Sequence, residues 1–338
     1  MKQILLTAAF IFAYSCTSNS SKTVKSSPVI EDSKWVIDST LPKGHIGRYG
    51  ILPNTYYSDA QVKKVLEMNA LGVELFFPND IYDINLVFDS SKGNKIVFDN
   101  TTIKGRLYII GSDGALSEDI QLLGKLKVLD KVFLRHAQNI KLETLKVISD
   151  STNSKRGTDN PGVSIYAGVD TLILDSLFIE NPTQNNQDHN KFSAAALQVH
   201  GWNNNPKNIS MDYVHIKNSG RSAVYLTGEN HEIGTLIIDS FGGTEDTNMA
   251  GLEDAIPGEE KKYKALWINK CNNCIVYEAE IIQELNENTH HLAVGIGDTS
   301  KPSIIEQLSF VSDNGEVSVL ERIPSNVIVR NTIHLNAE

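Results

Sequence analysis

Apolar residues recur along this chain in a fixed line, in which one apolar residue is followed by others two, five and seven positions later. The line is clearest in residues 139–147, 171–179 and 208–216. Counting these and the later copies, it starts at residues 140, 172, 209, 233, 274, 303 and 327, so successive starts differ by 24 to 41 residues. Alternation with a period of two is typical of strands. The recurrence therefore predicts a constant structural unit that carries insertions.

A second, shorter alternating segment precedes most copies of the line. These segments are residues 163–166, 197–200, 224–227, 266–269 and 317–319. Two strands per unit do not match a propeller blade, which has four, and the leucine and asparagine frame of a leucine-rich repeat is missing. A stack in which each unit buries its apolar face against the next does fit. The sequence predicts an all-β chain folded as a right-handed, single-stranded parallel β-helix.

The N-terminal part of the predicted domain contains a capping element. Residues 58–69 read as an amphipathic helix with Ser58 or Asp59 as its N-cap. The open end of a strand stack exposes unpaired backbone groups. We therefore expect this short helix to cover the N-terminal end of the stack.

The residues after this helix carry a family resemblance. A helix followed by Gly-Val-Glu-Leu-Phe-Phe-Pro-Asn-Asp-Ile-Tyr, residues 72–82, resembles the opening of the pectate-lyase-like right-handed parallel β-helix superfamily. The resemblance covers roughly residues 55–335 as architecture. It implies a scaffold used by polysaccharide lyases, glycoside hydrolases, epimerases and tailspike-type binding proteins. The catalytic signatures of pectate lyases and polygalacturonases are not complete in this sequence, so the resemblance assigns no residue a role.

The first residues predict export and lipidation. Lys2 precedes the apolar stretch 4–12, and Ala-Tyr-Ser-Cys resembles a bacterial lipobox, although Ala13 stands where leucine is usual. We expect a signal peptide at residues 1–15, a lipidated Cys16, a tether over 16–33 and one β-helix domain over 34–338. Such signals resemble those of Gram-negative carbohydrate-utilisation lipoproteins. An outer-membrane anchor facing the periplasm is favoured, with cleavage as a plain secretory peptide as the alternative.

Charge and cysteine content exclude some classes of protein. A formal net charge of −10 argues against a nucleic-acid binder. Cys271 and Cys274 lack a second pair of ligands for zinc, so we expect a local disulfide or two separate structural thiols. Neither a metal site nor a cofactor is expected, and the domain is predicted to be a monomer whose membrane contact is the lipid anchor.

Aligned on their apolar residues, the short segments place a set of polar and aromatic side chains on one outer face. One row contains Ser164, Gln198, Tyr225 and Trp267, and the next contains Tyr166, His200, Thr227 and Asn269. Aromatic faces pack on sugar rings and amides bond to hydroxyls, so this face suits a saccharide. The predicted substrate-binding residues are Tyr166, Gln198, Trp202, Trp267 and Asn269.

Basic residues precede several of these segments, which favours an acidic, uronate-containing poly- or oligosaccharide. Arg221 with Lys191 is predicted to hold the substrate carboxylate. His200 or His189 is predicted to be the base, and Tyr225 or Tyr166 the acid, of a β-elimination. Chain cleavage by a lyase and dehydration of an oligosaccharide would need the same groups, so both remain open.

Two alternative functions remain at this stage. A glycoside hydrolase needs two carboxylates beside the scissile bond, and the nearest candidates are Asp188, Glu229 and the acidic loop over residues 244–260. A binding or structural protein would use the same face only for docking. The remaining candidate histidines, His136, His215, His231, His290 and His291, are interpreted as surface or turn residues.

Overall fold

The computed structural model describes residues 32–148, 162–182, 195–201, 203–242, 263–283, 289–321 and 325–336. They belong to one compact unit that begins at Asp32. Strands dominate this described part, which contains one α-helix, so the predicted all-β class is confirmed. No helix among these residues is long and apolar enough to cross a membrane.

Three short helical elements precede the strands: η1 (Ser33–Trp35), η2 (Ile46–Tyr49) and α1 (Asp59–Ala70). The predicted helix is confirmed, with Ser58 as its N-cap. The backbone N–H of Ser58 donates to the side chain of Gln61 (3.0 Å), which is one half of a capping box. At the other end, the Asn69 amide donates to the carbonyl of Lys95 (2.7 Å), which ties α1 to the following strands.

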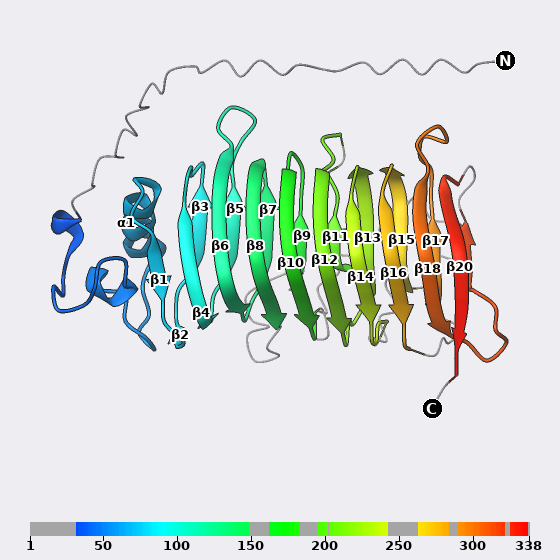
Figure 1. Cartoon of the computed structure of the whole chain (residues 1–338), viewed down its shortest axis with the longest axis horizontal. Coiled ribbons are helices and arrows are strands. Elements are labelled where there is room, and N and C mark those ends of the chain that lie inside the picture. Colours follow the sequence, from blue (N-terminus) through cyan, green and yellow to red (C-terminus); the bar gives the residue numbers. More distant parts are fainter. Residues whose placement is uncertain are drawn as a thin grey trace, which may run out of the picture. The chain divides into compact units, whose positions relative to one another are not determined.

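The strands form two interleaved sets. In each set, a strand pairs in parallel with the strand two places later in the chain. We call β3–β5–β7–β9–β11–β13–β15–β17–β19 the odd ladder and β4–β6–β8–β10–β12–β14–β16–β18–β20 the even ladder, and Figure 1 shows them in chain order. The short strands β1 (Leu75–Phe77) and β2 (Ile81–Tyr82) pair with β4.

The odd ladder consists of β3 (Leu86–Asp89), β5 (Leu107–Ile110), β7 (Val132–Arg135), β9 (Val163–Ile165), β11 (Ala195–Val199), β13 (Ser222–Glu229), β15 (Tyr263–Asn272), β17 (Thr289–Val294) and β19 (Val319–Glu321). The even ladder consists of β4 (Lys95–Ile103), β6 (Ser117–Val128), β8 (Ala137–Ile148), β10 (Asp170–Glu180), β12 (Lys207–Lys217), β14 (Glu232–Ile238), β16 (Ile275–Ile281), β18 (Ser303–Val311) and β20 (Val327–Leu335).

Both predicted segments of the repeat are found in these ladders. Copies of the long line lie on β8, β10, β12, β14, β16, β18 and β20, and the short segments lie on β9, β11, β13 and β15. The copy predicted to start at Ile233 is displaced by two residues, because Ile233 pairs with Met211, the second apolar position of the line on β12. The last short segment is displaced, because β19 begins at Val319, its final residue. The register aligns buried Val163, Leu197, Val224 and Leu266, so the apolar positions stack into one core.

Asparagines at the entrance to the even ladder explain why the repeat usually begins with this residue. Asn208, Asn230 and Asn273 have φ values of 54°, 58° and 56°, in the left-handed region that asparagine tolerates. Their side chains bond in series, from Asn273 to Asn230 (2.8 Å) and from Asn230 to Asn208 (3.1 Å). The turns of neighbouring units are therefore held in the same register as their strands.

Candidate functional site

The predicted outer face of the odd ladder has the register expected from the sequence. Ser164 pairs with Gln198, Gln198 with Tyr225, and Tyr225 with Trp267. Each alternates with buried aliphatic neighbours, so this row lies on the side opposite the core. Tyr166, His200 and Asn269 follow the buried residues Ile165, Val199 and Ile268. Asn269 lies on β15, whereas Tyr166 and His200 come directly after the last residues of β9 and β11.

Four rings on this face contact one another in sequence, and we call them the aromatic row: Tyr166, His200, Tyr225 and Trp267. The ring centroids of Tyr166 and His200 are 4.8 Å apart, with an edge-to-face geometry. The His200 and Tyr225 centroids are 6.0 Å apart, and those of Tyr225 and Trp267 are 4.8 Å apart. Residues far apart in sequence thus form one continuous set of rings across four neighbouring strands.

The face is more enclosed than the sequence suggested. Gln198 is 6% exposed and Trp267 is 7% exposed, whereas Tyr166, His200 and Tyr225 are half-buried. Contacts between the rings account for part of this burial. The predicted open surface is therefore a partly closed one.

Thr227 does not belong to the outer row, contrary to the prediction. It is 4% exposed, and its hydroxyl donates to the carbonyl of Val199 (3.2 Å). The register of β13 against β15 shifts between Leu226 and Gly228, which is why the outward alternation fails here. Gly228 has a φ of 124°, and a Cβ at this position would lie 2.1 Å from the Pro206 carbonyl oxygen.

His200 is held in its neutral form by its surroundings. Burial lowers the pKa of His200 from 6.5 to about 4, because a charged imidazolium is penalised away from water. At neutral pH the ring is therefore unprotonated and can accept a proton. Beside it, the amide of Asn269 donates to the Tyr225 phenol oxygen (3.2 Å), so the hydrogen of this phenol is directed to a different acceptor.

Lys264 is a cation beside the aromatic row, and the sequence counted it only among the basic residues that precede the short segments. The Nζ of Lys264 lies 5.1 Å from the centre of the Trp267 ring, and Lys264 is only 2% exposed. The signal was present, since Lys264 precedes Trp267 by three residues. Arg221, the predicted carboxylate partner, directly precedes β13. Lys264 is therefore a second candidate for the carboxylate partner.

Several predicted residues cannot be placed. His189, Lys191, Trp202 and the lipidation site Cys16 lie outside the described residues. Among the described members of the predicted site, the structure brings together Tyr166, Gln198, His200, Tyr225, Trp267 and Asn269.

Two histidines expected at the surface or in turns are buried in β17. His291 is 0% exposed, and its Nε2 lies 2.9 Å from the Val311 carbonyl while its Nδ1 accepts from the Ser318 N–H (3.0 Å). Burial lowers the pKa of His291, so the ring is a neutral structural group. His290 is 7% exposed and its Nδ1 lies 2.7 Å from the Ser318 hydroxyl.

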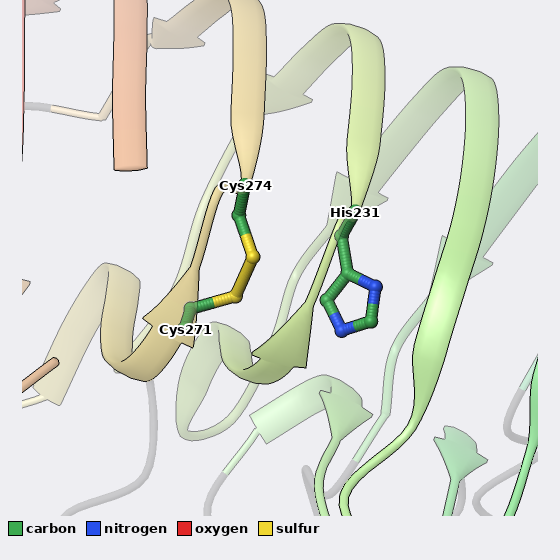
Figure 2. Close-up of side chains that lie close together, drawn as sticks. All are labelled: His231, Cys271 and Cys274. Atoms are coloured by element: carbon green, nitrogen blue, oxygen red, sulfur yellow. A yellow bond between two sulfur atoms is a disulfide. The ribbon is translucent and has the colours of Figure 1, made fainter. Parts of the chain in front are cut away.

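One group of described side chains has the composition of a metal site: His231, Cys271 and Cys274, whose ligand atoms all lie within 4.8 Å of one another. Figure 2 shows the two sulfur atoms joined in a disulfide with the histidine ring beside them. The Nδ1 of His231 accepts from the Ile209 N–H (3.3 Å), and its Nε2 lies 3.0 Å from the Thr227 carbonyl. With these contacts occupied, the group is a structural one, and of the two arrangements expected for the cysteines the structure has the local disulfide.

Acid is expected to destabilise the fold through His231, a turn residue that is unexpectedly only 1% exposed. Burial, the largest cause, lowers its pKa from 6.5 to about 4. Between these values the unfolded chain binds a proton that the folded chain does not, so stability falls as the pH falls. Urea titrations should show a loss of about 1.4 kcal/mol per pH unit from this group, or about 3 kcal/mol in all.

The control for this prediction is a His231→Leu variant. Its free energy of unfolding should depend less steeply on pH between 6.5 and 4, with a residual slope from His200 and His291, whose pKa values are lowered in the same direction. Parallel curves for the variant and the wild-type protein would contradict the assignment.

Comparison with known proteins assigns this chain neither a family nor a function. No protein-family model matches it, and neither a curated protein nor a solved structure is significantly similar to it.

Proposed function

We propose that this protein is a carbohydrate-active enzyme that acts on a uronate-containing poly- or oligosaccharide by β-elimination. The observation that carries the proposal is the aromatic row. In it, the neutral His200 lies between the rings of Tyr166 and Tyr225, and Trp267 contacts Tyr225 on the far side. Aromatic faces bind the apolar faces of sugar rings. A general base and a general acid for elimination lie within the same row.

The proposed reaction uses three of the described side chains. His200 takes the proton from C5 of the uronate, the C4–O bond breaks as the C4=C5 double bond forms, and the leaving oxygen takes a proton from Tyr225. Lys264 neutralises the uronate carboxylate, onto which charge is delocalised when C5 loses its proton. The same steps describe cleavage of a chain by a lyase and loss of water from an oligosaccharide by a dehydratase.

Glycoside hydrolysis on the same scaffold is the second candidate, and the described residues favour it less. Glu229, the nearest carboxylate predicted from the sequence, pairs with Lys301 (2.9 Å) and Lys207 (3.8 Å). The hydrogen bond and charge of Lys301 lower the pKa of Glu229, which makes it a poor general acid. The other candidates, Asp188 and the acidic loop over residues 244–260, lie outside the described residues.

We further propose that the two ladders are the sheets of a right-handed, single-stranded parallel β-helix with α1 at its N-terminal end. Parallel pairing between every second strand supports this architecture. Cleavage after residue 15 and lipidation of Cys16 would anchor the domain to the outer membrane on its periplasmic side. The disulfide between Cys271 and Cys274 supports export, because such bonds persist mainly in oxidising compartments.

Elimination is tested with a panel of acidic glycans: polygalacturonate, alginate, hyaluronan and chondroitin sulfate. We expect one of them to yield a product whose C4=C5 double bond, conjugated to the carboxylate, absorbs in the ultraviolet. Release of reducing ends without this absorbance would assign hydrolysis instead. Binding without either signal would assign a non-catalytic glycan-binding protein.

A further inference from the structure

The aromatic row continues beyond the proposed reaction centre, toward the N-terminal strands. Tyr108 on β5 pairs in register with Phe133 on β7, and Phe133 pairs with Ser164 on β9. The ring centroids of Tyr108 and Phe133 are 6.1 Å apart, and those of Phe133 and Tyr166 are 6.0 Å apart. The six rings therefore form a continuous line along the odd ladder from β5 to β15, in which Tyr166 and His200 directly follow β9 and β11 and the other four lie on their strands.

Positive charges accompany the first rings of this line. The Lys131 Nζ lies 5.6 Å from the centre of the Tyr108 ring, and the exposed Arg135 places its guanidinium carbon 5.9 Å from that of Tyr166. Arg106 also lies over Tyr108, at 5.9 Å, but its charge is balanced by Asp130 (2.9 Å). Lys131 and Arg135 thus bring cations to these strands in a chain whose net charge is −10.

We propose that Tyr108, Phe133, Lys131 and Arg135 form an extension of the binding site that holds further residues of a polyanionic glycan. The inference rests on the proposed function for the class of ligand. Parallel strands lie about 4.8 Å apart, so the six strands span about 24 Å, which is the length of several sugar residues. Successive sugar rings of an unbranched glycan can stack on successive rings of this line, and Lys131 and Arg135 attract the carboxylates of the glycan.

The extension sets the preferred length of the substrate. A disaccharide at His200 and Tyr225 leaves Tyr108 and Phe133 uncovered, whereas an octasaccharide reaches them and gains their stacking and charge contacts. A ladder of rings that only covers the sheet would give no such dependence on length. The extension thus makes the protein an enzyme of polymers rather than of disaccharides.

The test is calorimetric titration with disaccharides and octasaccharides prepared from polygalacturonate, alginate, hyaluronan and chondroitin sulfate. For the glycan that binds, we expect the octasaccharide to bind at least about tenfold more tightly than the disaccharide. Phe133→Ala and Arg135→Gln should each reduce this ratio severalfold without changing the affinity for the disaccharide. Phe178→Ala and Arg330→Gln are matched controls on the even ladder and should leave the ratio unchanged.

The outcomes separate this inference from the proposed function. Length-dependent binding that both variants reduce, with no unsaturated product, would support the extension and reject elimination. Elimination with equal affinity for short and long chains, or a length dependence that the variants leave intact, would overturn the extension alone. Failure of every glycan to bind would overturn both.

Discussion

Replacement of His200 by alanine is expected to lower kcat on the acidic glycan by about 10²- to 10⁴-fold, which is the usual contribution of a general base. KM should change much less, because Tyr166, Tyr225 and Trp267 still bind the sugar rings. On its acidic side, the wild-type profile of kcat/KM against pH should lose activity only below about pH 4, since the pKa of His200 in the free protein is lowered to about 4. The variant should lack this acidic limb.

Two further variants make the result specific. Tyr225→Phe keeps the ring contact with Trp267 but removes the proposed acid, so kcat should fall on the same scale while glycan binding persists. His215→Ala removes a half-buried histidine on β12, in the even ladder, and should leave turnover unchanged. Circular dichroism checks that each variant is folded. Activity of His200→Ala close to that of the wild type would reject His200 as the base.

The fold was predictable from residue 137 onward because the apolar line keeps its spacing there. Buried positions such as Leu174, Met211 and Ile233 recur at equivalent places and stack in register. The strands β3 to β7 were not identified individually from the sequence. Three of them, β3, β5 and β7, have only four residues, and the pairing of β4 with β6 contains a register shift between Phe98 and Thr101, so the spacing changes.

The composition of the site was easier to predict than its burial. Period-two alternation is enough to place Gln198, Tyr225 and Trp267 in one row, because parallel strands in register repeat each side chain at the same position. Alternation does not report which outer residues are covered. Lys264, Trp267 and His290 are buried, and the bulge that removes Thr227 from the row depends on the backbone conformation of Gly228.

The largest effect on stability is expected from Leu174→Ala on β10, with Ile173→Ala as its neighbour and control. Leu174 is 3% exposed and stacks between Leu142 and Met211, so its truncation should lower the free energy of unfolding by about 2–5 kcal/mol. Ile173 is 45% exposed, and its truncation should cost less than about 1 kcal/mol. Urea denaturation followed by circular dichroism measures both. Since a slip of one residue would exchange the two faces of the strand, equal or reversed costs would show that the register of β10 in the even ladder is wrong.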